Sequence, residues 1–320
     1  MSFSNPAAAT PPGSVGADTG SQEALPLAEW IGATYMEAAS TGEIPVQPWT
    51  LSRVGARPGF WAYWRQVWGR RAFILADARA KAYQTTRGML LGKLWLVVSP
   101  FLNAAIFWVV FGLLLKVSRG VPNFLGYLVI GIGFFAYMQA ALSKGSQVLS
   151  TSRNLIRSFA FPRASVMVSW SVRSLLDFVP IVVATMLFAY ILTPAQPTWR
   201  AFAIIPIVLI ATVFVNGLAM VTASLTSGLP DLKFIWPLLG RFWFYVSGVF
   251  FSLDRFESFF WVSFVMQANP GYIFLTMSRD VLIYSTMPDL FTWIYFTTWA
   301  VGMWLIGAIL FWLREETYSE

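Results

Sequence analysis

Six long apolar runs divide the chain, and they restrict its fold more than any other feature. They cover residues 94–115, 124–142, 164–192, 201–226, 234–252 and 291–313. A helix needs about 20 residues to cross about 30 Å of hydrocarbon, and each run reaches or approaches that length. Inside a bilayer a helix satisfies its own backbone hydrogen bonds, which an irregular segment does not. We therefore predict an all-α integral membrane protein with six transmembrane helices and a transmembrane domain over 94–313.

Composition supports the membrane assignment and excludes several kinds of chemistry. Of the 320 residues, 57% are hydrophobic and 12% are charged, whereas soluble domains usually carry about a quarter charged residues. The chain has no cysteine and no histidine, which removes thiolate–metal chemistry and the commonest general base. No glycine-rich loop has the phosphate-binding pattern, because Gly92-Lys93 lacks the upstream Gly and the following Ser or Thr. We expect no catalytic residue, no metal and no cofactor bound by this chain.

The basic residues indicate how the chain crosses the membrane. Nine Lys and Arg residues lie in 53–93 and four in the loop 143–163, whereas few lie in the loops expected on the opposite side. Lys and Arg resist translocation, so both regions should be cytosolic. The same rule explains the net charge of +7 better than nucleic-acid binding does, and we expect no nucleic-acid partner. The predicted topology is a multi-pass membrane protein with both termini in the cytosol, including the tail 314–320.

Two different segments precede the first span. Residues 1–52 are rich in Ala, Pro, Gly, Ser and Thr and carry only acidic charges, which is typical of a disordered extension; we expect no cleavable signal peptide, since no basic segment leads into an apolar one. Residues 53–93 reverse the charge, and Trp61, Trp64 and Trp68 recur there at helical spacing. This pattern predicts an amphipathic helix in the membrane interface. A soluble amphipathic helix that packs on a partner is the alternative.

Residues 253–290 do not fit a simple external loop. Phe259–Met266 is apolar but too short to span, and Tyr272–Tyr284 is interrupted by Arg279-Asp280. Asn269-Pro270-Gly271 lies between them and is a strong turn signal. We predict two short re-entrant helices before the last span, an arrangement tolerated at membrane depth only beside protein or a cavity. Two helices lying flat on the outer surface are the alternative.

Three charged residues lie inside predicted spans. Arg173 and Asp177 are four apart on one face of the third span, so a neutralising ion pair is the simplest explanation. Arg241, in the fifth span, has no acid three or four residues away; it snorkels to the interface, pairs across a subunit boundary, or faces an aqueous or anionic path. Because Asp177 is the only acid well inside a span, the sequence offers no pair of carboxylates for acid–base catalysis.

The fifth span is crowded with aromatic side chains. Phe242, Phe244, Tyr245 and Phe251 are candidates to line a translocation path with Arg241, because the C–H faces of sugars stack on aromatic rings; core packing or an interfacial belt is the ordinary role of such residues. Phe242 and Tyr245 share one helical face, and Phe244 and Phe251 share another. Only one face can look into a path, and the sequence does not identify it. Tyr245 is the stronger single candidate, since its hydroxyl needs a polar partner.

Two basic surfaces are candidates for contacts outside the hydrocarbon. The loop 143–163 has no acid, and its middle, 147–159, can form a short helix; it is either a topology signal alone or a docking element for a cytosolic protein. Arg65, Arg70 and Arg71 should lie beside the inner leaflet. There they can hold an anionic lipid head group through paired hydrogen bonds.

Four motifs together resemble the permeases that export polysaccharides and polyol phosphates, which belong to the ABC-2 class of ATP-driven transporters. They are Arg153-Asn154-Leu155-Ile156 with Phe161-Pro162-Arg163; Pro230-Asp231-Leu232-Lys233; Phe244-Tyr245-Val246-Ser247-Gly248-Val249-Phe250; and Asn269-Pro270 with Arg279-Asp280. Their order and spacing against six spans carry the resemblance, which covers about residues 58–316. Gly248 departs from the pattern, because many members have Pro after Ser there; Gly can also break a helix.

The resemblance implies a permease subunit, without an ATPase of its own, of an exporter of a lipid-linked polysaccharide or polyol-phosphate polymer. It implies a homodimer of permeases in the bacterial cytoplasmic (inner) membrane and two separate nucleotide-binding ATPase subunits that hold ATP-Mg. The implied substrate is an undecaprenyl- or decaprenyl-pyrophosphate-linked glycan, such as an O-antigen, a teichoic acid or a galactan. The residues that it assigns to ATPase coupling are Arg153, Asn154, Leu155, Ile156, Arg157 and Phe161.

The resemblance also implies a translocation path between two protomers, and we choose the first and fifth spans for its walls. Two other classes of function stay open at this point. A membrane-embedded enzyme of lipid-linked sugar metabolism needs a catalytic acid in a cleft, for which only Asp177 is available. An ion-coupled carrier works without an ATPase and often has internal repeats. The dependence of transport on ATP separates these classes.

Overall fold

The computed structural model describes residues 59–84, 94–114, 123–158, 162–192, 198–251, 253 and 259–315. All of them belong to one unit of the chain, Pro58–Glu320. Their regular secondary structure is entirely helical. The helices are α2 (Phe60–Gly69), α3 (Arg71–Gln84), α4 (Leu94–Phe107), α5 (Phe124–Ser143), α6 (Val148–Thr151), α7 (Arg153–Ser158), α8 (Ala164–Leu192), α9 (Ile204–Gly228), α10 (Leu232–Val246), α11 (Phe260–Ala268), α12 (Pro270–Leu282) and α13 (Leu290–Leu313), with a π-helical segment η1 (Trp108–Leu114) and 3₁₀ turns η2 (Gly145–Gln147) and η3 (Trp199–Ala203). The predicted extension 1–52 and most of the tail 314–320 lie outside the described residues.

Four helices in the described part of the chain are long and apolar enough to cross a membrane. They are Phe124–Thr151, Ala164–Tyr190, Trp199–Gly228 and Leu290–Leu313. These helices correspond to the predicted second, third, fourth and sixth spans, so the prediction of an all-α, multi-pass membrane protein is confirmed. The predicted first span is helical through α4 and η1, but its apolar helix, Val97–Val110, is shorter than the other four. The count of six spans is not confirmed and stays a prediction.

The predicted fifth span, 234–252, is corrected at its C-terminal end. Helix α10 has 15 residues and ends at Val246, because Gly248 takes a left-handed backbone conformation with φ of 65°. A Cβ atom at this position would lie 2.9 Å from the Tyr272 ring and 3.1 Å from the Met266 methyl group. Glycine fits there, whereas a larger side chain would force a neighbour to move. Gly248 thus supplies the helix break that the sequence left undecided.

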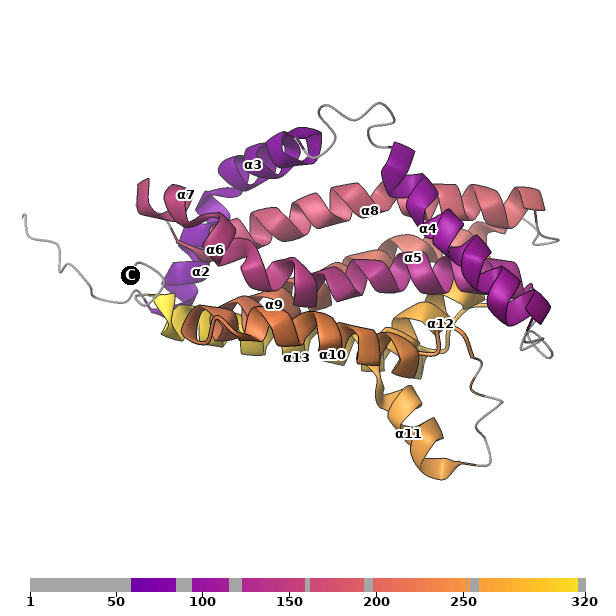
Figure 1. The fold of residues 1–320 in the computed structure, drawn as a ribbon. Helices are drawn as coiled ribbons and strands as arrows, with labels where there is room; N and C mark the ends of the chain where they lie inside the picture. Colours follow the sequence, from indigo (N-terminus) through magenta and orange to yellow (C-terminus); the bar gives the residue numbers. More distant parts are fainter. Residues whose placement is uncertain are drawn as a thin grey trace, which may run out of the picture. The chain divides into compact units, whose positions relative to one another are not determined.

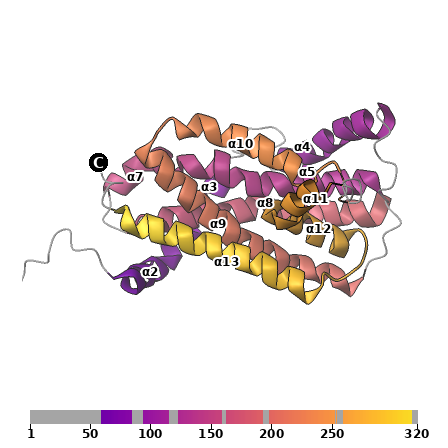
Figure 2. The same ribbon diagram turned by 90° about the horizontal axis from the view of Figure 1, so that it is seen from below.

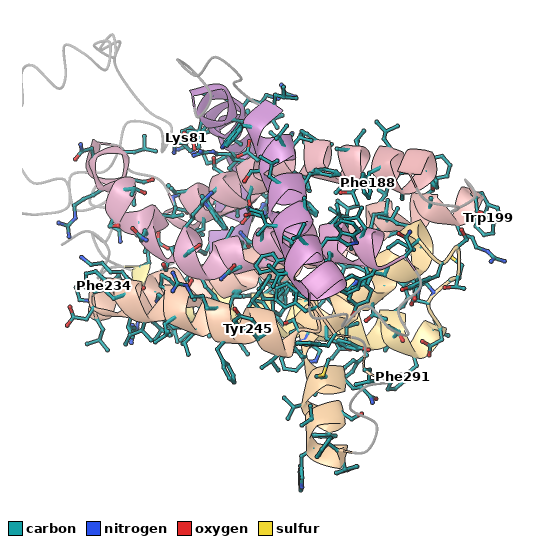
Figure 3. The ribbon with its side chains drawn as sticks, turned by 45° about the vertical axis from the view of Figure 1, so that its right-hand side comes forward. Lys81, Phe188, Trp199, Phe234, Tyr245 and Phe291 are labelled. Atoms are coloured by element: carbon teal, nitrogen blue, oxygen red, sulfur yellow. The ribbon has the colours of Figure 1, made fainter. Side chains whose placement is uncertain are left out.

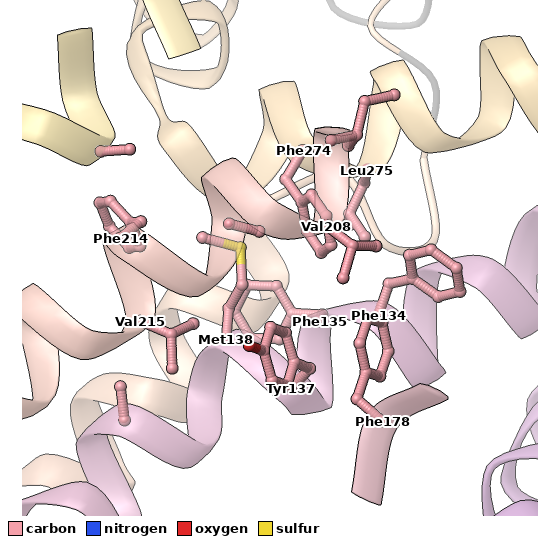
Figure 4. Packing of buried hydrophobic residues seen from close by; sticks show 14 of the residues in the cluster. Phe134, Phe135, Tyr137, Met138, Phe178, Val208, Phe214, Val215, Phe274 and Leu275 are labelled. Atoms are coloured by element: carbon pink, nitrogen blue, oxygen red, sulfur yellow. The ribbon is translucent and has the colours of Figure 1, made fainter. Parts of the chain in front are cut away.

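Helix α5 lies at the centre of the bundle. Most of its side chains are buried, and it packs against α4, α8, α9, α10 and α12. In Figure 4, Phe134 of α5 lies beside Phe178 of α8 and Phe274 of α12, with ring centroids 5.0 and 5.8 Å away. Aromatic pairs at such distances contribute beyond their buried area. One aromatic core therefore holds the short helix α12 against two of the long helices.

Helices α9 and α13 approach each other closely through two glycines. An added Cβ atom at Gly217 would meet the Trp304 backbone nitrogen at 2.5 Å, and one at Gly307 would meet the Gly217 carbonyl oxygen at 2.5 Å. Small residues let the backbones of two membrane helices approach closely. Lipid is as apolar as the side chains, so the hydrophobic effect does not drive this association, and van der Waals contacts stabilise it instead. Figure 2 shows α9 running between α13 and α10. This packing leaves α10 at the edge of the bundle.

The fold gathers distant segments at two ends of the bundle (Figure 1). Helices α2, α6 and α7 lie at one end, which we call the α7 end. Helices α11 and α12 lie at the other, the α12 end, and α11 stands away from the bundle. These two are the short helices predicted on either side of the Asn269-Pro270-Gly271 turn, and Asn269 caps α12 by accepting a hydrogen bond from the Gly271 N–H at 2.9 Å. Their depth in a membrane stays a prediction.

Candidate functional site

Helix α10 presents one face to the bundle and leaves the opposite face uncovered. Gly240 is buried against Gln139 of α5, where an added Cβ atom would lie 2.8 Å from the amide nitrogen. On the other face Phe242 is 68% exposed and Tyr245 is 58% exposed. Figure 3 shows Tyr245 pointing away from the bundle. The exposed face also carries Arg241 and the apolar side chains Phe234, Ile235, Leu238 and Leu239. We call it the α10 outer face.

The second pair of candidate path residues points the other way. The Phe244 ring packs against Phe135 of α5 and Phe250, with ring centroids 5.3 and 5.1 Å away. Phe251 is half-buried and also contacts Phe250. Phe251 lies beyond the end of α10 and after Gly248, so the prediction that it shares a helical face with Phe244 is wrong. Phe242 and Tyr245 lie on the outer face, whereas Phe244 and Phe251 contribute to the core.

A hydrogen-bonded junction joins the end of α10 to the start of α12. The Trp243 indole N–H donates to the Asn269 side-chain oxygen at 2.7 Å, and the Asn269 amide donates to Ser247 Oγ at 2.9 Å. Asn269 also caps α12 and is buried. A buried polar network that is satisfied fixes one arrangement of its members. The α10 outer face is thus held rigidly relative to α11 and α12.

Arg279 has a role that the sequence did not reveal. The sequence identifies it only as a charge that interrupts the apolar segment Tyr272–Tyr284, whereas its side chain is 2% exposed, inside α12. Its guanidinium donates to the carbonyl oxygens of Gly248 (3.1 Å), Val249 (3.3 Å) and Tyr127 (3.3 Å), and it lies 3.3 Å from the centroid of the Tyr127 ring. The Tyr127 hydroxyl donates to the carbonyls of Gly248 and Phe251 at 2.9 and 2.7 Å. Together they provide donors for the carbonyl groups of Gly248, Val249 and Phe251, in the non-helical segment that follows α10.

The residues predicted to couple to an ATPase are Arg153, Asn154, Leu155, Ile156, Arg157 and Phe161. Phe161 and the side chain of Arg157 lie outside the described residues. Arg153 and Asn154 are exposed on α7, and Leu155 is half-buried. Ile156 is 8% exposed and belongs to the hydrophobic core. Ile156 therefore anchors α7 to the bundle, whereas Arg153 and Asn154 have the exposure that a partner contact needs.

Glu315 fastens the end of α13 to other elements at the α7 end. Its carboxylate accepts a hydrogen bond from the Arg163 backbone N–H at 3.1 Å and one from the Tyr63 hydroxyl of α2. That hydroxyl also accepts a hydrogen bond from the Ala164 N–H at 3.1 Å, at the start of α8. Burial raises the pKa of Glu315, and the Tyr63 and Arg163 contacts offset only part of that rise. Ionisation of Glu315 is therefore costly in this contact between three helices.

The amphipathic region is split into two helices rather than one. Helix α2 ends at Gly69 and α3 starts at Arg71, and the three predicted tryptophans all lie on α2. Trp61 and Trp68 are exposed, whereas Trp64 turns inward and packs against Trp304 of α13, with ring centroids 4.9 Å apart. The predicted head-group residues lie at this junction and are all exposed: Arg65, Arg70 and Arg71. Their exposure leaves them accessible to an anionic ligand.

The predicted ion pair within α8 is confirmed. Arg173 Nε lies 3.8 Å from Asp177 Oδ2, and the two side chains are 29% and 26% exposed. Because both are partly exposed and both line a groove beside α5, the pair faces an accessible space and is not sealed in the core.

Comparison with known proteins agrees with this architecture. Residues 73–283 match the family described as ABC-2 type transporter. The chain is 22% identical over 256 residues to the O-antigen export system permease protein RfbA of Myxococcus xanthus. The aligned region covers 80% of this chain and 97% of that protein. It is 26% identical over 243 residues to the O-antigen export system permease protein RfbA of Klebsiella pneumoniae. This second aligned region covers 73% of this chain and 88% of that protein. Since the family match runs from α3 to the end of α12, over more than half of the sequence, this chain belongs to the ABC-2 type transporter family.

Proposed function

We propose that this chain is the transmembrane permease subunit of an ATP-driven exporter that moves a lipid-linked polysaccharide across the cytoplasmic membrane. Family membership supports the transporter class, and the names of the relatives support a polysaccharide of the O-antigen kind as the substrate class. The observation that carries the proposal is the α10 outer face. It combines exposed rings, Phe242 and Tyr245, with the exposed cation Arg241 at the edge of the bundle.

The chemistry of this face suits a glycan better than it suits lipid alone. Each hydroxyl of a sugar that loses water without gaining a partner costs about 1–3 kcal/mol by protein mutational data, so a glycan needs polar partners along its route. The Tyr245 hydroxyl and the Arg241 guanidinium offer such partners. The rings of Phe242 and Tyr245 offer flat surfaces for the C–H faces of pyranoses. Pure lipid contact would require none of these polar groups.

The proposed assembly is a homodimer of permeases with two separate ATPase subunits that bind ATP-Mg. The α10 outer face of one protomer would then face that of its partner across the path, with α4 as the neighbouring wall. The α7 end would lie in the cytosol, where Arg153 and Asn154 contact the ATPase. Both chain termini would be cytosolic in the bacterial inner membrane. These assignments follow the charge distribution and the exposed residues of α7.

The proposed substrate head group is a pyrophosphate on an undecaprenyl or decaprenyl carrier, bound near Arg65, Arg70 and Arg71. Arg forms paired hydrogen bonds to phosphate, and these three side chains are exposed at the α2–α3 junction. The double substitution Arg70→Ala with Arg71→Ala should weaken export while leaving subunit assembly and basal ATPase activity unchanged. Export at the wild-type rate in that variant would return these arginines to a topological role alone.

The function is tested in two steps. Depletion of the protein in its host, followed by mass spectrometry of membrane lipids, should show accumulation of a lipid-linked glycan on the cytosolic leaflet. Proteoliposomes that contain the permease and its ATPase partner should then translocate that glycan only when ATP is present. Translocation without the ATPase would favour an ion-coupled carrier, and chemical conversion of the lipid-linked sugar by this chain alone would favour a membrane enzyme. Either result would overturn the proposal.

A further inference from the structure

A groove between α5 and α8 carries charged and aromatic side chains that none of the surfaces above uses. It has a volume of about 430 Å³, with Lys144 at its rim and Trp170, Arg173 and Asp177 along α8. A second groove, of about 520 Å³, adjoins it at the α7 end and also contains Trp170 and Arg173, together with Asp77 and Lys81 from α3. Together we call them the α5–α8 groove. Volumes of this order are typical of sites for small ligands.

Four of the five charged residues in this groove form two pairs, and the fifth is Lys144 at the rim. Arg173 and Asp177 form the ion pair at 3.8 Å, and Lys81 Nζ lies 2.9 Å from Asp77 Oδ2. Asp77 also accepts a hydrogen bond from Ser169 of α8 at 2.5 Å. Paired charges create little net field, so a strongly anionic or cationic ligand has little to gain here. They do place hydrogen-bond donors and acceptors side by side, which a ligand that both donates and accepts can use.

Three aromatic rings also contribute to the wall. Trp170 is half-buried where the two parts of the groove meet. Deeper in the groove, the rings of Tyr137 and Phe178 are stacked with centroids 4.3 Å apart and planes 6° from parallel. Flat apolar faces next to paired donors and acceptors match a pyranose ring, which has C–H faces and a rim of hydroxyl groups.

The ion pair is hard to explain by stability alone. Ionisable residues inside membrane segments are expensive, and replacing such a pair by packed apolar side chains is often neutral or stabilising. An i,i+4 ion pair that is partly exposed contributes only about 0.3–0.5 kcal/mol to a helix. The two side chains keep about a quarter of their surface exposed to the groove. The position is therefore better explained by a ligand than by packing.

We infer that the α5–α8 groove is a carbohydrate subsite, which binds an uncharged pyranose unit of the glycan as it enters from the α7 end. Arg173 and Asp177 hydrogen-bond the sugar hydroxyls, and Trp170 stacks on the ring. The inference rests on the proposed function, because it assumes that the transported molecule is a glycan. It adds that this chain itself contacts sugar, on α8 and away from the α10 outer face.

The absence of native cysteine allows a direct binding test. Ser174→Cys places one thiol in the lining of the groove, and Ser227→Cys places a control thiol on the exposed end of α9. The purified full-length protein is kept in a detergent without a sugar head group, and its labelling rate with a small thiol reagent is measured. The probes are tetrasaccharides of mannose, galactose or N-acetylglucosamine, with inorganic pyrophosphate as the anionic comparison. At a probe concentration of about twice its Kd, labelling at Ser174→Cys should slow about threefold, while Ser227→Cys should be unaffected.

Two further variants assign any protection to the proposed residues. Arg173→Gln with Asp177→Asn should abolish protection by the sugar. Trp170→Phe should weaken the protection by the sugar. Because it keeps an aromatic ring, this variant tests the site even if the first variant folds poorly. Gln267→Ala, at an exposed position on α11 outside the groove, should leave sugar protection intact.

The inference would be overturned if pyrophosphate alone slowed labelling of Ser174→Cys, or if no tetrasaccharide slowed it. Either result would leave the proposed function standing if ATP-dependent export in proteoliposomes persists. Loss of ATP dependence in that separate assay would instead count against the function.

Discussion

The buried guanidinium of Arg279 lies beside the turn that follows α10, where the carbonyl groups of Gly248 and Val249 lie outside the helix. In the folded protein these carbonyls are satisfied by Arg279 and Tyr127. The planar guanidinium serves several acceptors and stacks on the Tyr127 ring at the same time. Arg279 thus stabilises the turn at Gly248 that connects α10 with the segment leading to α11.

Removing this side chain should destabilise the fold. Arg279→Ala leaves buried carbonyls without partners, at a cost of about 1–3 kcal/mol for each one. Arg279→Lys keeps the charge but lacks the planar fork, so it should restore only part of the loss. Thermal unfolding in detergent measures both, with the exposed Arg241→Ala as the matched control. An Arg279→Ala protein as stable as wild type would contradict this role.

Glu315 should make stability depend on pH. Its pKa is raised in the folded protein, mainly by burial, so the folded state holds the proton from the ordinary glutamate value up to the raised one. Within that window the folded state binds more protons than the unfolded state, and stability therefore falls as pH rises. Glu315→Gln keeps the acceptor for the Arg163 N–H and should flatten this part of the profile. Unfolding midpoints measured across the window test it.

The control for this profile is Asp231→Asn, which removes an exposed carboxylate at the start of α10. A Glu315→Gln protein that keeps the wild-type slope would show that Glu315 is not the titrating group.

At the scale of elements, α10 joins a packed face and an open face in one short helix. Gly240 and Trp243 fit the bundle, while Phe242 and Tyr245 stay exposed. Helix α7 has the same division on a smaller scale, because Ile156 enters the core and Arg153 and Asn154 do not. Substitutions on the two faces of each helix should therefore separate function from stability.

Alanine substitutions along α10 test this division. Phe242→Ala and Tyr245→Ala should change stability by no more than about 0.5 kcal/mol, as is usual for exposed sites. They should reduce export about tenfold, which corresponds to about 1.4 kcal/mol. Phe244→Ala, whose ring packs in the core, should instead lower stability by about 2–4 kcal/mol. Export assays and thermal unfolding of the same variants measure both effects; wild-type export by both outer-face variants would remove α10 from the path.

Substitutions in α7 test coupling to the ATPase. Arg153→Glu with Asn154→Ala should weaken binding of the ATPase by about 2 kcal/mol or more, if these residues are binding hot spots. Membrane insertion and thermal stability should be unchanged, since both side chains are exposed. Co-purification of the two subunits and stimulated ATPase activity are the measurements. Gln147→Ala, at an exposed position before α6, is the matched control, and unchanged co-purification of the double variant would refute the assignment.

At the scale of the whole molecule, the two ends of the bundle should face opposite sides of the membrane. Single cysteines at Gln147, near the α7 end, and Thr286, after α12, occupy exposed positions. In intact cells an impermeant thiol reagent should label Thr286→Cys and should leave Gln147→Cys unlabelled, because the basic segments hold the α7 end in the cytosol. Permeabilised cells, in which both should react, provide the control. The reverse pattern in intact cells would invert the proposed topology.

The sequence by itself determined the class of fold and much of the order of its elements. Apolar runs and basic loops can be recognised from the transfer free energy of each residue into the membrane, which does not depend on the residues that it contacts in the fold. The four long helices, the Arg173–Asp177 pair and the turn at Asn269 follow directly from such local patterns. The resemblance of ordered motifs to the export permeases led to the family, although no single motif was specific.

Only the tertiary structure decided where side chains point and which charges are buried. The spacing of Phe242, Phe244 and Tyr245 defines two faces but not their neighbours, and exposure depends on how α10 packs against α5. The sequence identifies Arg279 only as a charge that interrupts an apolar segment, because its acceptors, the carbonyls of Tyr127, Gly248 and Val249, come from distant parts of the chain. Ile156 was read as a docking contact for the same reason, since burial against other helices leaves no mark in a local pattern. Local periodicity records the preference of a segment, whereas contacts between segments far apart in sequence are fixed only when the chain packs.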